Sequence, residues 1–290
     1  MISPYLLLVR PQQWIKNLLV FLPAFFSGNI VSGNYVLLSV CAFLAFCLAA
    51  SAIYCLNDIR DAAADRAHPV KRRRPIASGA VKPATASVLM CALAVAAIGI
   101  CLAVKSEAGA AVIAVYLLLN VAYCLWLKRI AIVDVFVVSL GFVLRVLLGG
   151  VMCAIWVSPW IMSMTFLLAL FLAFAKRRDD VLLHEDMGIV TRKNITGYNR
   201  DFLNQTLGLI AAITMMCYII YTLTPAVEAR FQSSYVYVTS IFVLAGILRY
   251  LQLALVLGRT GSPTAVALHD RFIQWCVVLW IVFFIAIIYV

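Results

Sequence analysis

Long apolar stretches separated by shorter polar connections dominate the pattern of this 290-residue chain. A stretch of about 18 or more apolar residues with few charges can form a helix that spans a membrane. The pattern predicts nine such helices, at 15–31, 35–56, 84–104, 109–127, 131–152, 157–175, 202–223, 234–257 and 271–290. Since helices satisfy their own backbone groups in lipid, we expect an all-α, polytopic membrane protein in which residues 1–290 form a single bundle and a single domain.

Composition agrees with this class. The chain is 65% hydrophobic and only 12% charged, and its mean hydropathy of +1.04 excludes a soluble globular protein. The nine cysteines lie in apolar segments or at their ends and form no CxxC pair. We therefore expect small buried thiols rather than a disulfide framework or a zinc site.

Positive charge is concentrated on alternate connections. Twenty of the 23 Lys and Arg residues lie before the first predicted helix, at its start, or in and around the connections that share its side of the membrane. The positive-inside rule places the N-terminus and these connections in the cytoplasm and the C-terminus outside, in an integral protein of the cell (inner) membrane. The net charge of +11 is therefore mainly a topology signal, and it calls for no nucleic acid partner. Two of the cytoplasmic connections, 58–83 and 176–201, are long enough to predict a functional cap.

One polar stretch, 57–75, interrupts the apolar pattern after the second predicted helix. If that helix continues, Asp58, Asp61 and Asp65 share a face, because residues three, four and seven apart lie on one side of a helix. Carboxylates placed together repel one another unless a cation lies among them, and Mg²⁺ binds through carboxylates together with substrate phosphates. The bases that follow offer partners for phosphate oxygens, and they include Lys71, Arg72 and Arg74. The alternative is a solvated helix end followed by a positive-inside loop.

Other polar residues lie at the cytoplasmic ends of helices or inside them. The connection 176–201 joins bases directly to acids, and together with 58–83 it could close over one anionic substrate. Arg145 lies within an apolar helix, where a charge is costly, so it either lines a polar cavity or is a snorkelling or salt-bridged arginine. The remaining candidate substrate-binding residues, each with a membrane-boundary or pairing role as the alternative, are Arg10, Lys16, Tyr123, Lys128, Asp134, Lys176, Arg177 and Arg178.

At Asn57-Asp58-x-x-Asp61-x-x-x-Asp65 the sequence resembles the first aspartate-rich motif of the UbiA superfamily of intramembrane prenyltransferases. The resemblance extends over essentially the whole chain. The motif Arg10-Pro11-x-Gln13-Trp14-x-Lys16-Asn17, the stretch 65–79 with His68 and Pro69, and Lys176-Arg177-Arg178 are similar to the decaprenyl-phosphate phosphoribosyltransferase branch. The second connection departs from the DxxxD spacing of the aromatic prenyltransferases, which leaves its ligands open.

The resemblance implies a UbiA-like bundle that carries out Mg²⁺-dependent transfer of 5-phosphoribose from phosphoribosyl pyrophosphate to a polyprenyl phosphate at the cytoplasmic face. It implies that Asp58, Asp61 and Asp65 are the catalytic metal ligands and that Asn57 assists them. It also implies that Arg66 and the bases named above bind the substrates, with Arg10 and Lys16 orienting the lipid phosphate. Membrane lipids are further expected partners, and a homo-oligomer is left open.

Two alternatives stay open. A related enzyme would move a prenyl group from prenyl diphosphate to an aromatic or other small acceptor, but that reaction brings one strongly anionic group, whereas phosphoribosyl transfer brings three. A lipid or ion transporter would place charges along a path through the bilayer. Here only Arg145 is clearly within a predicted span, which favours a transferase.

Overall fold

The computed structural model describes residues 3–28, 30, 32–67, 71–187, 194–258, 266 and 269–289. Every regular element among them is a helix, which confirms the predicted all-α class. Within these residues, eight helices are long and apolar enough to cross a membrane: Gly33–Ala67, Pro83–Ala103, Glu107–Leu125, Val133–Met152, Pro159–Asp186, Arg200–Thr222, Val236–Val256 and Arg271–Ile288. They match eight of the nine predicted spans.

The first predicted span, 15–31, is built differently. Residues Pro11–Phe21 form the 3-10 helix η1, and Leu22–Phe26 form the short α-helix α2. Pro23 explains the break, because it lacks an N–H and its ring clashes with the carbonyl four residues earlier in an α-helix. This part of the chain is therefore helical, as predicted, but it is not one continuous α-helix.

The chain divides into two compact units, Met1–Lys128 with Gly141–Val157, and Arg129–Leu140 with Ser158–Val290. The assignment of 1–290 to a single transferase domain stays a prediction. So does the assignment of the connections 58–83 and 176–201 to an active-site cap.

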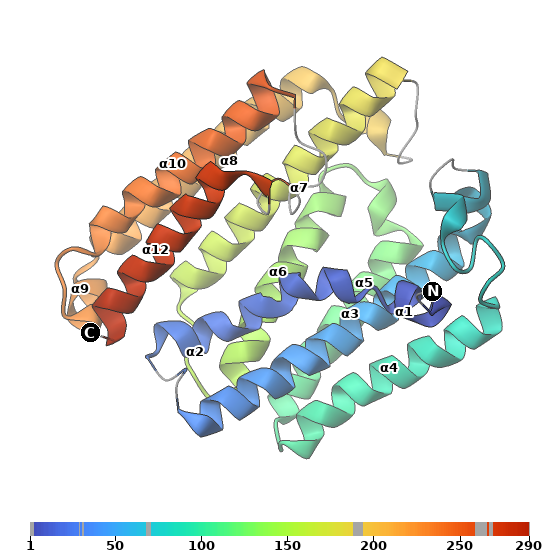
Figure 1. The fold of residues 1–290 in the computed structure, drawn as a ribbon, viewed down its shortest axis with the longest axis horizontal. Helices are drawn as coiled ribbons and strands as arrows, with labels where there is room; N and C mark the ends of the chain where they lie inside the picture. The colour runs from blue at the N-terminus through green and yellow to red at the C-terminus, as the bar shows by residue number, and fades with distance from the viewer. Residues whose placement is uncertain are drawn as a thin grey trace. The chain divides into compact units, whose positions relative to one another are not determined.

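The first unit is built around α3 (Figure 1). Its elements are α1 (Pro4–Val9), η1, α2, α3 (Gly33–Ala67), η2 (Lys71–Arg73), α4 (Pro83–Ala103), α5 (Glu107–Leu125) and the later part of α6 (Val133–Met152). The 3-10 helix η3 (Leu127–Arg129) joins α5 to the second unit along the chain. Helix α3 packs against α1, η1, α4 and α5, and Phe46 and Ile113 lie fully buried in the core between them.

A close approach fixes η1 against α6. A Cβ atom added at Gly149 would lie 1.9 Å from the backbone oxygen of Val20, so only glycine fits there. Small residues of this kind let helices approach closely in membranes.

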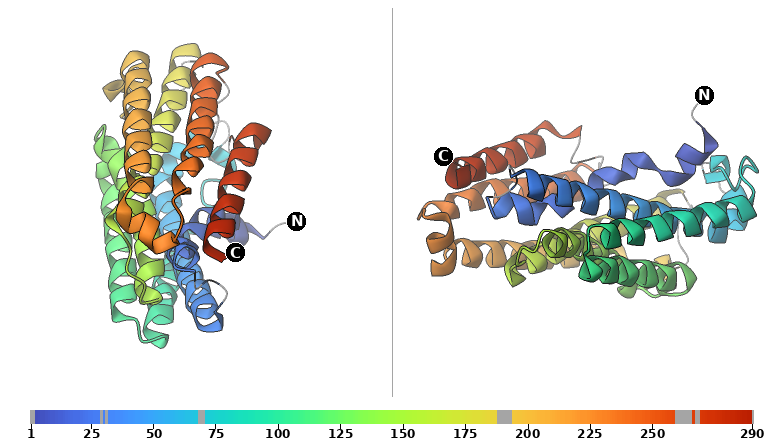
Figure 2. Two further views of the ribbon diagram at one scale, coloured as in Figure 1. Left: turned by 90° about the vertical axis from the view of Figure 1, so that its left-hand side faces the viewer. Right: turned by 90° about the horizontal axis from the view of Figure 1, so that it is seen from below.

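The second unit is a set of long helices, of which α7, α8, α10 and α12 run side by side (Figures 1 and 2). Its elements are the start of α6, α7 (Pro159–Met187), η4 (Ile195–Gly197), α8 (Arg200–Thr222), α9 (Pro225–Phe231), η5 (Val236–Val238), α10 (Thr239–Leu251), the π-helix η6 (Gln252–Val256) and α12 (Arg271–Tyr289). Its core joins Phe171 and Phe174 of α7 to Leu203 and Leu207 of α8.

Two helices are too long for the bilayer alone. Helix α3 has 35 residues and α7 has 29, which at about 1.5 Å per residue gives roughly 52 and 44 Å, against about 30 Å of hydrocarbon. Residues 33–56 and 159–175 contain no charged side chain, so the charged ends are the parts that extend beyond the apolar span. The continuation of α3 through Asp65 was predicted. The boundary of the sixth span at residue 175 was wrong, because α7 continues to Met187.

Gly149→Ala should lower the melting temperature of the purified protein in detergent, because the new methyl group forces η1 and α6 apart at a cost of about 1–3 kcal/mol. The matched control is Gly99→Ala on α4, where an added Cβ meets nothing within 4 Å. Differential scanning fluorimetry compares the two. Equal melting temperatures would contradict the close contact.

Candidate active site

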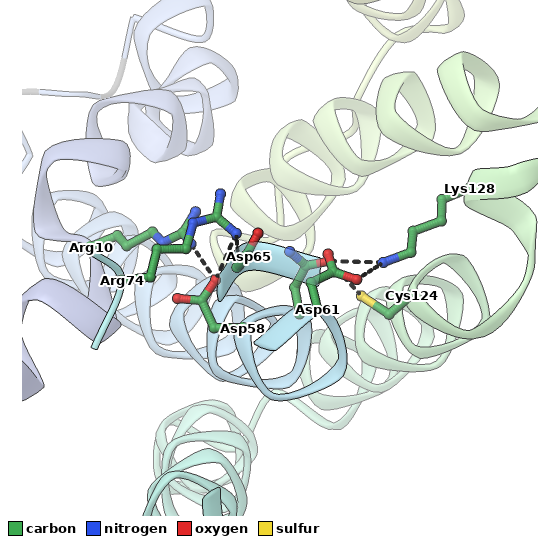
Figure 3. A network of polar contacts seen from close by, with 8 residues as sticks. Arg10, Asp58, Asp61, Asp65, Arg74, Cys124 and Lys128 are labelled. Atoms are coloured by element: carbon green, nitrogen blue, oxygen red, sulfur yellow. Dashed lines mark hydrogen bonds and ion pairs between the residues drawn. The ribbon is translucent and has the colours of Figure 1, made fainter. Parts of the chain in front are cut away.

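The charged end of α3 carries a buried carboxylate that two arginines hold. Arg10 Nη2 lies 2.5 Å from Asp58 Oδ1, and Arg74 Nη1 lies 3.3 Å from the same oxygen. Arg74 also donates to Asp65 Oδ2 at 2.8 Å. The Asp58 side chain is only 1% exposed, whereas the two arginine side chains are 21% and 26% exposed. One face of α3 therefore presents two carboxylates to two partly exposed guanidinium groups (Figure 3).

The adjoining face of α3 carries a second acid–base group. Lys128 Nζ lies 2.8 Å from Asp61 Oδ1 and 3.4 Å from Asn57 Oδ1. The thiol of Cys124, at the end of α5, also faces Asn57. In Figure 3 Lys128 and Cys124 approach α3 from the side away from Arg10 and Arg74.

Helical geometry explains the division into two groups. At 100° per residue, Asp58 and Asp65 differ by only about 20° around the helix, and Asn57 and Asp61 by about 40°. The three carboxylates therefore lie on one helix, as predicted, but on a pair of adjacent stripes instead of a single face. Each carboxylate is balanced by a base from another segment: the N-terminal segment, the residues after η2, or η3. Three carboxylates and three bases make the cluster electrically neutral.

The residues at this helix end fit Mg²⁺ in part. In the described part of the chain, no three His, Cys, Asp or Glu side chains are arranged to hold a metal by themselves, so Asn57, Asp58, Asp61 and Asp65 would need substrate oxygens to complete a metal site. Asp58 Oδ2, however, is buried without a hydrogen-bond partner, and such an atom calls for a cation or a water. Mg²⁺ is usually held by one or two carboxylates together with substrate phosphates and waters. The donor set suits that mode of binding.

The other predicted substrate-binding residues of the first unit, apart from Arg145, are exposed or partly buried. Arg66 is exposed, and its Nε donates to the Ala77 carbonyl at 3.4 Å. Arg72 is exposed, and Lys71 is partly buried in η2. Lys16 and Tyr123 are also partly buried, on η1 and α5. His68 and Pro69 lie outside the described residues.

Arg145 is buried in a cage of aromatic rings. Its Cζ lies 4.5 Å from the centre of the Phe46 ring, 5.0 Å from Phe142 and 5.5 Å from Tyr116. Its Nε donates to Asn17 Oδ1 at 2.8 Å, and no carboxylate of the described residues lies within ion-pair distance. Arg145 is therefore not the salt-bridged arginine that the sequence offered as an alternative to a cavity-lining one. Asn17, a buried polar residue that sequence reasoning did not assign to the site, is its partner.

In the second unit, Arg177 and Asp134 form a closed internal network. Arg177 Nε donates to Asp134 Oδ2 at 2.6 Å, and the Tyr198 hydroxyl donates to Asp134 Oδ1 at 2.7 Å. The backbone N–H of Ile132 donates to the Tyr198 hydroxyl at 2.6 Å. Burial raises the pKa of Tyr198, so this phenol stays a donor. Asp134 is fully buried, which points to a structural role in place of the predicted substrate contact.

Arg178 is likewise held internally. Its Nε donates to Asn204 Oδ1 and its Nη1 to the Ala254 carbonyl, both at 2.7 Å. Of the three predicted bases on α7, only Lys176 is exposed. Sequence reasoning missed Tyr198 and Asn204, since nothing in their spacing reveals that Tyr198 bonds the buried Asp134 and that Asn204 bonds the buried Arg178.

Comparisons with known proteins now decide the family. The UbiA prenyltransferase family profile matches residues 18–274. The chain belongs to the UbiA prenyltransferase family.

This UbiA family member is similar to named relatives over nearly its whole length. It is 37% identical to a decaprenyl-phosphate phosphoribosyltransferase of Mycolicibacterium smegmatis, covering 97% of this chain and 91% of the relative. It is 34% identical to the enzyme of the same name from Corynebacterium glutamicum, covering 97% and 86%. A UbiA homolog from Archaeoglobus fulgidus, solved bound to GPP and Mg²⁺, superposes with a TM-score of 0.71 at 20% identity, covering 99% of this chain and 100% of that one. The chain is thus an integral membrane transferase with the UbiA fold.

Arg177→Met should lower the melting temperature in detergent markedly, because it leaves the buried Asp134 carboxylate without its cation at a cost of about 3–5 kcal/mol. Lys176→Met, at the exposed neighbouring position, should change it little. Thermal unfolding of both variants checks this. A stable Arg177→Met protein that had lost only activity would return Arg177 to substrate binding.

Proposed function

We propose that this protein transfers 5-phosphoribose from phosphoribosyl pyrophosphate to a polyprenyl phosphate, in a Mg²⁺-dependent reaction at the cytoplasmic face of the membrane. Two relatives named decaprenyl-phosphate phosphoribosyltransferase, aligned over 97% of the chain, support this reaction. The twenty basic residues predicted on the cytoplasmic side support the orientation.

The observation that carries the proposal is the neutral acid–base cluster at the end of α3. The bases Arg10, Arg74 and Lys128 are partly exposed, and each is already held in place by a carboxylate. Pre-positioned cations of this kind bind phosphate groups without first having to be ordered. Both proposed substrates are anionic, so such a cluster suits them.

In this proposal the carboxylates Asp58, Asp61 and Asp65, with Asn57 assisting, hold Mg²⁺ on the pyrophosphate of the donor. When bound, the metal supplies Lewis-acid stabilisation of the negative charge that develops on the leaving group. Arg74 and Lys128 bind phosphate oxygens beside it, as do the partly buried Lys71 and the exposed Arg72 and Arg66. Arg10 and Lys16 orient the lipid phosphate.

The reaction forms one bond and breaks one. A phosphate oxygen of the acceptor attacks the anomeric carbon of the ribose, the bond from that carbon to the pyrophosphate oxygen breaks, and pyrophosphate leaves with the electron pair. Because the attacking oxygen is already anionic, the chain needs no strong general base. The charged side chains contribute electrostatic stabilisation and orientation.

A second candidate is prenyl transfer to a small acceptor. It is favoured by the solved UbiA homologs of the same fold that were bound to GPP or DMAPP with Mg²⁺. Those structures are at most 20% identical to this chain, whereas the phosphoribosyltransferases are 34% and 37% identical, which supports phosphoribosyl transfer more strongly. Membership of a transferase family also leaves the transporter alternative without support.

Purified protein in detergent with Mg²⁺ and polyprenyl phosphate should move label from phosphoribosyl pyrophosphate into the lipid phase, and EDTA should abolish the transfer. The parallel reaction contains labelled prenyl diphosphate with 4-hydroxybenzoate. Label entering product only in the second reaction would assign the protein to prenyl transfer. Transfer from phosphoribosyl pyrophosphate that persists in EDTA would contradict the metal role.

A further inference from the structure

Hydrogen bonds on either side of Arg10 hold the N-terminal segment, residues 3–21, against α3. Ser51 of α3 is fully buried, and its hydroxyl donates to the Val9 carbonyl at 2.9 Å. The Trp14 indole Nε1 donates to the same hydroxyl at 3.1 Å. Ser51 therefore holds the backbone on one side of Arg10 and the η1 helix on the other. An interfacial anchor, the ordinary explanation for Trp14, would not require this bond.

The backbone at Arg10 is one that non-glycine residues seldom adopt. Its φ of 54° and ψ of 60° are left-handed, at the junction where α1 ends and η1 begins. Such a residue costs free energy and persists when surrounding contacts fix it, which happens most often at functional sites. Ser51 contacts the chain on both sides of this turn, at the Val9 carbonyl and at the Trp14 indole.

Residues of α3 also fix the position of the Arg10 side chain. Its guanidinium lies over the Tyr54 ring, with Cζ 5.1 Å from the centroid, and reaches Asp58 at 2.5 Å. Ser51, Asp58 and Asp65 are spaced by seven residues, so they lie along one stripe of α3. One stripe thus holds the backbone beside Arg10, then its guanidinium, then Arg74.

We propose that Ser51, supported by Trp14, is a positioning residue that aims the Arg10 guanidinium at the phosphate of the lipid acceptor. This rests on the proposed function, in which Arg10 orients that phosphate. Without the hydroxyl, the Val9 carbonyl and the Trp14 N–H lose their partner, and the left-handed turn at Arg10 loses its support. Arg10 then samples other positions and acceptor binding weakens, whereas Asp58 on the donor side keeps Arg74 as a partner.

The test is a double-mutant cycle on the KM for polyprenyl phosphate. Ser51→Ala should raise that KM about tenfold with kcat within about twofold, the size expected for losing a buried hydrogen bond. In an Arg10→Ala background the same change should raise KM by less than about twofold, because nothing is left to position. Ser39→Ala is the matched control: it removes another fully buried α3 serine, whose hydroxyl contacts Cys153, and should leave KM unchanged in both backgrounds.

Amide hydrogen exchange gives a readout that does not depend on turnover. Ser51→Ala, but not Ser39→Ala, should speed exchange in peptides covering residues 6–13, where the Arg10 N–H bonds Leu6 and the Gln13 N–H bonds the Arg10 carbonyl. An equal KM effect with and without Arg10, or unchanged exchange, would overturn the proposal. A wild-type protein that forms no product from phosphoribosyl pyrophosphate would instead refute the proposed function, and the exchange comparison would still test Ser51.

Discussion

The constraint on which the site depends is the burial of a carboxylate at the end of α3. Asp58 is almost completely removed from solvent, and a buried carboxylate is costly unless cations and hydrogen bonds surround it. Arg10 and Arg74 meet this requirement, and they come from segments on either side of α3 in the chain. One charge thereby ties the N-terminal segment and the residues after η2 to one helix end. Asp61, which is more exposed than Asp58, likewise ties Lys128 of η3 to this helix end.

The two units show how similar residues serve different purposes. In the first, acids and bases are paired, but the bases keep about a fifth to a quarter of their side-chain surface exposed, so a further anion can reach them. In the second, Arg177 is nearly buried and Asp134 receives hydrogen bonds on both carboxylate oxygens. A buried network of this kind fixes helices in place, and these hydrogen bonds all go to internal partners. Exposure, rather than residue type, separates the proposed binding groups from the structural ones.

The sequence predicted the features that depend on local spacing. Apolar length predicted the eight membrane-spanning helices of the described residues, though not where each ends, and the spacing of Asp58, Asp61 and Asp65 predicted their helical arrangement. Features that depend on tertiary contacts were not predictable. Nothing local reveals that Arg177 finds Asp134, that Arg145 is surrounded by aromatic rings, or that α7 continues past residue 175. Ser51 was the exception that spacing could have revealed, because it lies seven residues before Asp58 on the same stripe.

The measurement that tests the metal site most directly is the thermal stability of wild-type protein and Asp61→Asn in the presence of Mg²⁺, pyrophosphate, and both together. Asp61 is 34% exposed, so the isosteric amide should leave the fold intact. If the α3 carboxylates hold the metal on the pyrophosphate, the combination should raise the wild-type melting temperature more than either alone, and Asp61→Asn should lose that gain together with turnover. Equal stabilisation of the two proteins, or full activity in Asp61→Asn, would contradict a metal-binding role for this end of α3.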